Sequence, residues 1–182
     1  MSNTSSPTEI LTLLKDIQLR SQQSASKLSQ DDLHGSWTAI GFRIAQHHLL
    51  IPLDETSEIF TVPSQITHVP KSKPWVFGIA NVRGELLPLF DLKYFLYGQT
   101  TQINKRSRIV VNNQPDLYSG LLLDEVFGLK HFQHEPEAIN DSSDDDALSN
   151  YLVGRINQLE KQWDVFSFNK LAADQRFLDA AA

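Results

Sequence analysis

The sequence of 182 residues contains no cysteine. This absence excludes disulfides, thiol nucleophiles and thiolate metal sites together, and it is compatible with a reducing compartment. Positive charge is also scarce, because 16 Lys and Arg stand against 22 Asp and Glu and leave a net charge of -6. A broad phosphate-binding surface is therefore not expected, although residues 105–108 form a short basic stretch. The balance favours proteins over nucleic acid as partners.

Long hydrophobic runs are missing too, because charge or proline interrupts each apolar stretch within a few residues. The N-terminus, MSNTSSPTEI, lacks the basic start and the apolar centre of a secretory signal. We therefore expect a cytoplasmic protein without a membrane-inserted segment. Hydrophobic residues make up 41% of the chain and charged residues 21%, which is typical of a globular domain with its own core.

Residues 1–35 differ in pattern from the rest of the chain. Ile10, Leu13, Leu14 and Ile17 recur at helical spacing and predict a short amphipathic helix. The polar tract RSQQSASKLSQDD follows and predicts a linker. Such a helix either packs on its own domain, as most amphipathic helices do, or serves as an arm that docks on a partner.

From Trp37 onward, short runs rich in β-branched, aromatic and leucine residues predict strands. The runs are residues 37–45, 47–53, 58–62, 76–82, 85–92, 108–113, 118–132, 151–161 and 162–174. The chain is expected to turn at Gln46-His47, to form a loop over 63–74, and to make a helical turn over 93–98 that Gly98 ends. The acidic stretch 135–146 predicts an exposed loop, and residues 170–182 predict a terminal helix. This pattern predicts an all-β sandwich or paired barrels.

Motifs for catalysis are absent, and neither an enzyme nor a cofactor is expected. The sequence has no phosphate-binding loop, no dinucleotide-binding glycine motif and no nucleophile elbow. His131 and His134 have a spacing that could place two imidazoles on one helix face, but their segment has the pattern of a strand end, which favours surface histidines over a metal site. Asp91 and Asp124 each follow an apolar run and are predicted to accept backbone hydrogen bonds in the turn that follows.

The strongest feature is the stretch PWVFGIANVRGELLPLFDL, residues 74–92, in which charge interrupts two apolar runs. A hairpin explains the position, because Gly84 can take the positive φ of a tight turn and leave Arg83 at the surface. The stretch resembles the CheW-like domain, the adaptor that joins chemoreceptors to a histidine kinase. The matching elements are Pro74-Trp75, Gly78, Asn81-Val82-Arg83-Gly84, Leu87-Pro88-Leu89 and Asp91-Leu92. ETSEIFTV, which contains Glu58, and SGLLLDEVFGL, which contains Gly120 and Leu129, are similar to the family's earlier and later strands.

The resemblance implies an all-β fold of two intertwined five-stranded, SH3-like barrels with short terminal helices. One barrel would be built mainly before residue 105 and the other mainly after it. The resemblance also implies no catalysis and two protein partners: the regulatory, CheW-like domain of a histidine kinase and the cytoplasmic tip of a methyl-accepting chemoreceptor. Glu58 is expected to accept a bidentate hydrogen bond from Arg83. The residues expected to bind partners are Glu58, Gly78, Asn81, Val82, Arg83, Gly84, Gly120 and Leu129.

The expected organisation is a helix and linker over 1–35, the CheW-like domain over 36–176 and a tail over 177–182. The sequence of residues 74–92 and the extension before Trp37 most resemble those family members that serve the chemosensory system of type IV pili and twitching motility. Such a protein would sit at receptor arrays on the inner membrane. A flagellar chemotaxis adaptor is the alternative within the family. A β-barrel nucleic-acid-binding module is the alternative outside it, but the acidic balance counts against the basic groove that it would need.

Overall fold

The computed structural model describes residues 36–113, 118–139, 146–158 and 161–180. The chain divides into two units, residues 1–36 and residues 37–182, and the described strands and helices belong to the second unit. The helix and linker predicted over 1–35 lie outside the described residues. In the described part of the chain, no helix has the length and apolar character needed to cross a membrane.

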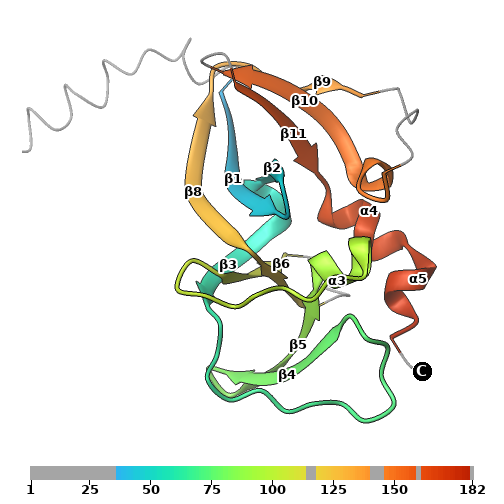
Figure 1. Ribbon diagram of the computed structural model, residues 1–182. Coiled ribbons are helices and arrows are strands. Elements are labelled where there is room, and N and C mark those ends of the chain that lie inside the picture. Colours follow the sequence, from blue (N-terminus) through green and yellow to red (C-terminus); the bar gives the residue numbers. More distant parts are fainter. Residues whose placement is uncertain (1–35, 114–117, 140–145, 159–160, 181–182) are drawn as a thin grey trace, which may run out of the picture. The chain divides into compact units, whose positions relative to one another are not determined.

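The strands lie in two sheets, of six and of five strands (Figure 1). The six-stranded sheet has the order β8 (Glu125–Phe132), β1 (Trp37–Ile44), β2 (His47–Pro52), β11 (Lys161–Phe166), β10 (Leu152–Gln158) and β9 (Glu137–Ala138). The five-stranded sheet has the order β3 (Thr56–Thr61), β6 (Arg108–Asn112), β7 (Gly120–Leu123), β5 (Glu85–Asp91) and β4 (Val76–Val82). The prediction of a mostly β fold is confirmed.

The predicted division of the strands at about residue 105 holds only in the main: three of the five strands of one sheet precede this residue, and four of the six strands of the other follow it. The six-stranded sheet takes its strands from both ends of the domain, and the five-stranded sheet takes the middle. A parallel pairing of β2 with β11, in which Leu50 opposes Val165, joins the two ends. A second parallel pairing, of β5 with β7, crosses the centre of the other sheet. The sheets are therefore interleaved along the chain, and they contain six and five strands rather than five each.

Three hydrophobic cores explain why the strand sequences are almost continuously apolar. One core lies within the six-stranded sheet, one within the five-stranded sheet, and a third draws residues from both and is called here the shared core. Successive residues of a strand point to opposite faces. On β6, for example, Ile109 and Val111 enter the core of the five-stranded sheet, whereas Val110 enters the shared core. Strands that are buried on both faces cannot show the polar alternation of a half-exposed sheet.

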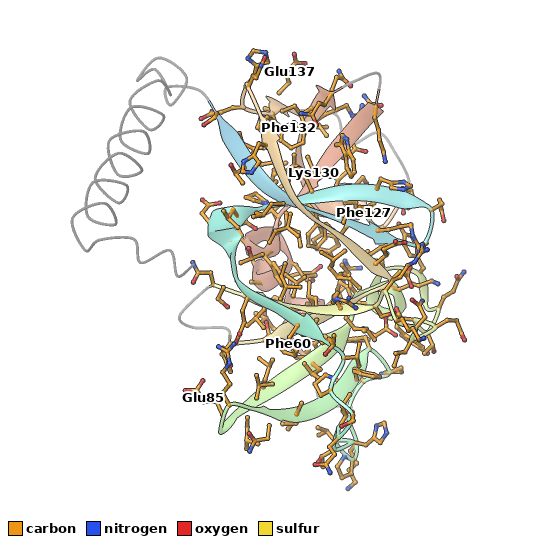
Figure 2. All side chains as sticks on the ribbon, turned by 90° about the vertical axis from the view of Figure 1, so that its left-hand side faces the viewer. Phe60, Glu85, Phe127, Lys130, Phe132 and Glu137 are labelled. Atoms are coloured by element: carbon orange, nitrogen blue, oxygen red, sulfur yellow. The ribbon has the colours of Figure 1, made fainter. Side chains whose placement is uncertain are left out.

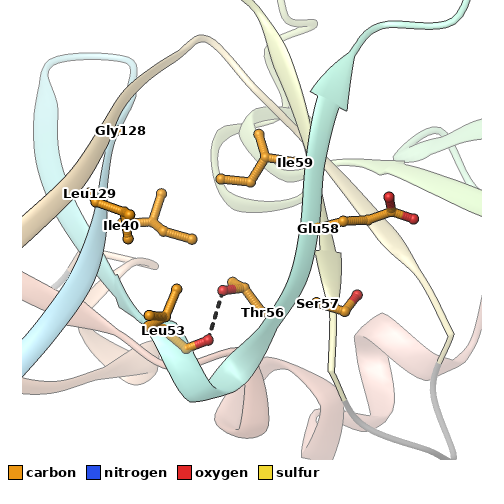
Figure 3. Close-up of a pocket in the computed structure, with 8 residues that line it drawn as sticks. All are labelled: Ile40, Leu53, Thr56, Ser57, Glu58, Ile59, Gly128 and Leu129. Carbon is orange, nitrogen blue, oxygen red and sulfur yellow. Dashed lines mark hydrogen bonds between the residues drawn. The ribbon is translucent and has the colours of Figure 1, made fainter. Parts of the chain in front are cut away.

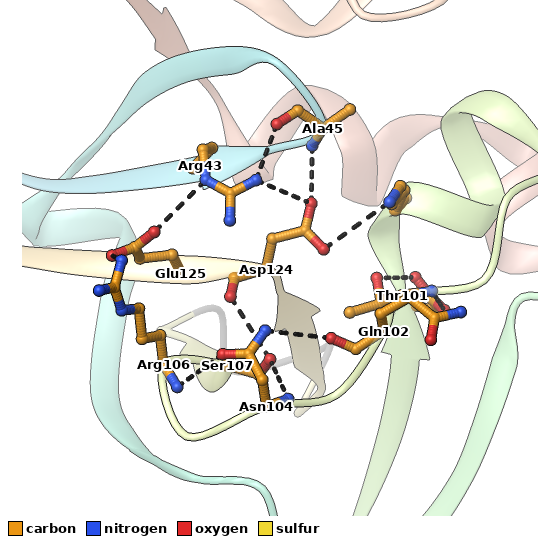
Figure 4. A network of polar contacts seen from close by, with 11 residues as sticks. Arg43, Ala45, Thr101, Gln102, Asn104, Arg106, Ser107, Asp124 and Glu125 are labelled. Atoms are coloured by element: carbon orange, nitrogen blue, oxygen red, sulfur yellow. Dashed lines mark hydrogen bonds and ion pairs between the residues drawn. The ribbon is translucent and has the colours of Figure 1, made fainter.

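The chain passes from one sheet to the other at Asp124. The sequence places Asp124 at the end of a strand, and β7 does end at Leu123 in the five-stranded sheet, whereas β8 begins at Glu125 in the six-stranded one. The buried Asp124 carboxylate accepts a hydrogen bond of 2.7 Å from the Ala45 backbone N–H (Figure 4). The prediction that this carboxylate bonds the turn that follows is wrong. Its backbone partner lies in the distant turn between β1 and β2.

Asp91 behaves as predicted, because its carboxylate accepts from the backbone N–H of Tyr94 at 3.1 Å and begins helix α3 (Leu92–Tyr97). Gly98 ends this helix with a φ of 66°, also as predicted. The turn between β1 and β2 is one residue earlier than predicted, at Ala45-Gln46, and places His47 on β2.

The C-terminal region contains two short helices, α4 (Phe168–Ala173) and α5 (Gln175–Leu178), instead of one continuous helix. Ser167 and Asp174 accept hydrogen bonds at the first turn of each helix. Phe177, which the sequence places in a tail, is buried in the shared core. The structured domain therefore extends past residue 176. Two single turns, η1 (Leu53–Glu55) and η2 (Ser149–Tyr151), complete the described elements.

Candidate functional site

The hairpin between β4 and β5 presents Arg83 at its tip. Arg83 and Gly84 both have positive φ, 54° and 92°, and Val82 pairs with Glu85 across the two-residue turn. Positive φ at both central residues is the geometry of a type I′ turn. The side-chain oxygen of Asn81 accepts a hydrogen bond of 2.9 Å from the Gly84 N–H and supports this turn. The predicted positive φ of Gly84 is confirmed.

The left-handed backbone of Arg83 was not predicted from the sequence. A residue with a Cβ is disfavoured there by about 1 kcal/mol relative to glycine. The sequence did contain a signal for this conformation, because a two-residue loop between two strands favours a turn that requires positive φ at both loop residues. An arginine that is retained in a strained position at an exposed tip is typical of a residue with a role in recognition.

Glu58 holds the Arg83 side chain, with 3.1 Å between Arg83 Nη1 and Glu58 Oε2. The predicted partner is confirmed, but the contact is an ion pair rather than the bidentate hydrogen bond expected. The Arg83 side chain is 81% exposed. Tyr118 lies nearby, and its pKa is raised by burial and by the negative charges of Glu85 and Glu58. The tip thus carries an arginine and two carboxylates beside a tyrosine.

A bulge in β3 places Glu58 on the outer face of that strand. The pairing of β3 with β6 shifts register between Thr56 and Glu58. As a result, Ser57 and Glu58 point to one side of β3, whereas Thr56 and Ile59 point to the other (Figure 3). The face that carries Ile59 lines a groove, which Ser57 and Glu58 also border. Glu58 meets the hairpin tip as well.

The groove has a volume of about 460 Å³ and lies among β1, η1, β3 and β8 (Figure 3). Leu129 is 56% exposed at its rim, and Leu53 and Ile59 are also exposed. Thr56 donates its hydroxyl hydrogen to the Leu53 carbonyl oxygen at 3.0 Å, so this polar lining group is satisfied within the domain. The lining residues are Ile40, Leu53, Thr56, Ser57, Glu58, Ile59, Gly128 and Leu129. An exposed cluster of branched apolar side chains is typical of a protein-binding surface.

The remaining predicted site residues have structural surroundings. Gly78 is buried, with a φ of 143°, and a Cβ there would lie 2.6 Å from Ile66 Cγ2 and 2.7 Å from the Thr67 carbonyl oxygen. A Cβ at the buried Gly120 would lie 2.6 Å from Ile109 Cγ2. Val82 is half-buried against the core of the five-stranded sheet. These three residues shape the sheet that supports the hairpin.

The eight predicted residues therefore separate into two surfaces and a scaffold. Arg83 and Glu58 meet at the hairpin tip, and Leu129 lies at the groove, which Glu58 also lines. Sequence reasoning missed Ile40, Leu53 and Ile59, which complete the groove. No local pattern could have found them, because they come from three different elements that only the fold brings together.

Comparisons with known proteins place the chain in a family. Residues 38–175 match the family described as the CheW-like domain. The chain is 36% identical to Protein PilI of Pseudomonas aeruginosa over 182 residues, which are 100% of this chain and 99% of PilI. It is 26% identical to the chemotaxis protein CheW of Helicobacter pylori over 145 residues, which are 79% of this chain and 87% of that protein.

A solved structure supports the fold. The scaffolding protein TtCheW from Thermoanaerobacter tengcongensis superposes with a TM-score of 0.61 at 22% sequence identity. The match covers 71% of this chain and 88% of that protein. The two interleaved sheets are therefore an architecture already observed in a scaffolding protein.

Proposed function

This chain belongs to the CheW-like domain family of non-catalytic chemotaxis-type adaptors, and we propose that it couples a methyl-accepting chemoreceptor to a CheA-type histidine kinase in a system that controls type IV pili and twitching motility. The proposal places the chain in the cytoplasm, beside receptor arrays at the inner membrane. It requires no cofactor, because an adaptor acts by holding two proteins together.

The observation that carries the proposal is the 36% identity to PilI along the whole chain, including the residues that precede the family's matched region. A relative that shares the extension as well as the domain supports the pilus branch of the family. A flagellar chemotaxis adaptor is the second candidate, supported by the 26% identity to the Helicobacter CheW.

The groove suits the receptor tip, which in this family is a helical hairpin. An amphipathic helix binds by inserting apolar side chains from one face into a hydrophobic groove. Leu53, Ile59 and Leu129 offer such a surface. The groove is therefore assigned to the receptor.

The hairpin tip suits the kinase regulatory domain. Arg83 is exposed but held in direction by Glu58, so less conformational freedom is lost when it binds than for a free arginine. A partner carboxylate could displace or share Glu58 and accept from the guanidinium. Glu58 borders both surfaces, because it pairs with Arg83 and also lines the groove. Arg83 and Leu129 themselves come from separate elements, the β4–β5 turn and β8, so the proposal has one chain contact both partners at once.

Binding titrations of the full chain with a receptor-tip hairpin and with a kinase regulatory domain test this assignment. Leu129→Glu is expected to weaken receptor binding at least about tenfold, as charge does at the centre of an apolar interface, and to leave kinase binding intact. Leu178→Glu is the matched control, because Leu178 is also exposed, at 46%, but lies on α5. Arg83→Ala is expected to show the opposite selectivity, with Arg106→Ala as its control.

Arg106 is a close match for Arg83, because its side chain is 75% exposed and its Nη1 lies 3.2 Å from Glu125 Oε1. If the wild-type chain bound neither partner, the adaptor role would be wrong for these proteins. If it bound pilus and flagellar components of the same organism equally well, the pathway would be wrong while the adaptor role stood.

A further inference from the structure

A group of aromatic and basic side chains lies on the six-stranded sheet and includes the two neighbours on β8 of the groove residues Gly128 and Leu129. We call it the cation–aromatic patch, and its members are His48 on β2, Phe127 and Lys130 on β8, and Lys161 and Trp163 on β11. His48 stacks on Phe127, with ring centroids 5.4 Å apart and an interplanar angle of 13°. Both rings also make edge-to-face contacts with Trp163, with ring centroids 6.1 Å apart for His48 and 6.2 Å apart for Phe127. The three strands thus build one aromatic platform.

Two lysine ammonium groups lie over this platform. Lys161 Nζ is 4.1 Å from the centroid of Trp163, and Lys130 Nζ is 5.7 Å from the same ring. The Lys130 stem crosses Gly41, where an added Cβ would lie 3.3 Å from Lys130 Cγ. Phe127 and Lys130 follow one another along β8 (Figure 2). Cation–π attraction therefore favours the position of both ammonium groups over the ring, while Lys161 stays exposed to solvent.

The patch is locally positive in a chain whose net charge is -6. Within the ranges that the structure describes, neither Lys130 nor Lys161 forms an ion pair with a carboxylate. The neighbouring Arg43 does, with Asp124 and Glu125. The pKa of His48 is lowered by burial and by the positive charges of Lys161 and Arg43. Among the described residues, the two lysines thus carry positive charge without a carboxylate partner.

We propose that the cation–aromatic patch binds an acidic peptide segment of a partner protein, with its carboxylates on Lys130 and Lys161. This is a third interaction surface, beyond those assigned to the receptor and the kinase. Because the ammonium groups are already positioned, the segment binds without ordering them first. Nucleic acid fits less well, since it needs open aromatic faces for base stacking. Trp163 is only 5% exposed, and Lys161 covers its ring.

A fluorescein-labelled hexaglutamate peptide, titrated into the full chain at low ionic strength, tests the proposal. The wild type is expected to bind, with an affinity that falls as salt is added. Lys130→Gln/Lys161→Gln is expected to lose about tenfold or more, as removal of a charge-assisted contact does. Lys71→Gln/Lys105→Gln is the matched control, because it removes the same charge from two exposed lysines elsewhere.

Lys130→Arg/Lys161→Arg keeps both charges and both cation–π contacts and is expected to retain binding. Thermal melts of all variants show whether a loss reflects the fold. The proposal is overturned if the wild type does not bind hexaglutamate, if the Gln pair binds like the control pair, or if single-stranded DNA of equal charge binds more tightly than the peptide. Receptor and kinase titrations with the Gln pair separate this surface from the proposed adaptor function, because both are expected to be unchanged.

Discussion

Arg83 at the tip of the β4–β5 hairpin reaches Glu58 on β3, with 3.1 Å between Nη1 and Oε2, although β4 and β3 are the two ends of the five-stranded sheet's order. The sheet must therefore curl until its edges approach. A second contact between the two ends of the sheet supports this curvature. Thr67, which follows β3 in the chain, and Ile79 on β4 exchange two backbone hydrogen bonds of 2.9 Å. The hairpin tip is thus fixed by the closure of the sheet.

Replacing Arg83 separates turn strain from recognition. Arg83→Gly relieves the left-handed backbone, whereas Arg83→Ala keeps it, and both variants lose the exposed ion pair, which contributes at most about 1 kcal/mol. We expect the Gly variant to unfold with a free energy about 1 kcal/mol higher than that of the Ala variant. Urea denaturation measures this order. If Arg83→Ala is as stable as Arg83→Gly or more stable, the turn accommodates a Cβ at no cost in free energy, and the backbone of Arg83 is not strained.

Gly78 and Gly120 are expected to matter through packing rather than through contact with partners. Gly78→Ala meets the Thr67 carbonyl oxygen and requires a φ of 143°, and Gly120→Ala meets Ile109 and Leu89. We expect each substitution to destabilise the domain by about 1 to 3 kcal/mol, the usual cost of overpacking. Gly84→Ala is the control, because nothing lies within 4 Å of its Cβ and only backbone strain remains. Denaturant titration of the three variants should rank Gly84→Ala as the mildest.

The local elements were predictable from the sequence because their causes are local. The apolar runs around Arg83-Gly84 predicted the β4–β5 hairpin, and Asp91 and Gly98 marked the two ends of α3. These signals depend on neighbours a few residues apart. The identity of Glu58 as the partner of Arg83 came from family resemblance. The resemblance placed Glu58 on a neighbouring strand, which is wrong, because β3 is not adjacent to β4 or β5 in the sheet.

The division between the sheets was not predictable in the same way. The run from residue 118 to residue 132 is apolar on both sides of Asp124, so Asp124 marks the end of β7, but nothing local shows that β8 joins the other sheet. The parallel pairing of β2 with β11 joins segments that are far apart in the sequence. The groove depends on both of these long-range features, because its lining comes from both sheets. Non-local pairing therefore explains what the sequence did not show.

Asp124 is expected to stabilise the junction between the sheets. Its carboxylate bonds the Ala45 N–H and lies 3.7 Å from Arg43 Nη1 and 3.9 Å from Lys93 Nζ. Asp124→Asn removes the negative charge and leaves both cations less compensated, so we expect a loss of about 2 to 3 kcal/mol in unfolding free energy. Asp54→Asn changes an exposed aspartate and serves as the control. If Asp124→Asn loses no more unfolding free energy than the control, water compensates the two cations and Asp124 does not stabilise the junction.

Tyr151 and Asp174 are expected to give the stability of the domain two separate pH dependences. The Tyr151 hydroxyl donates to Asp174, and Arg176 Nη2 donates to the Tyr151 oxygen at 2.8 Å. The hydrogen bond from Arg176 lowers the pKa of Asp174 to about 2. Because this pKa is depressed by folding, the stabilisation is present above the ordinary aspartate pKa of about 4 and is lost as pH falls toward 2. Asp174→Asn should remove this acid slope.

On the alkaline side the sign reverses. Burial, followed by the hydrogen bond to Asp174, raises the pKa of Tyr151 to about 12. A pKa that folding raises contributes stability below the unfolded value of about 10, which is lost as pH rises from there toward 12. Tyr151→Phe should therefore cost about 1 kcal/mol at neutral pH, for the lost hydrogen bonds. It should also reduce the slope above pH 10, to which Tyr97 still contributes because burial raises its pKa. Urea midpoints measured across this range, with Tyr94→Phe as the control, check both effects. An alkaline slope in Tyr151→Phe equal to that of the wild type would assign the titration to another group and would leave the hydroxyl with a packing role alone.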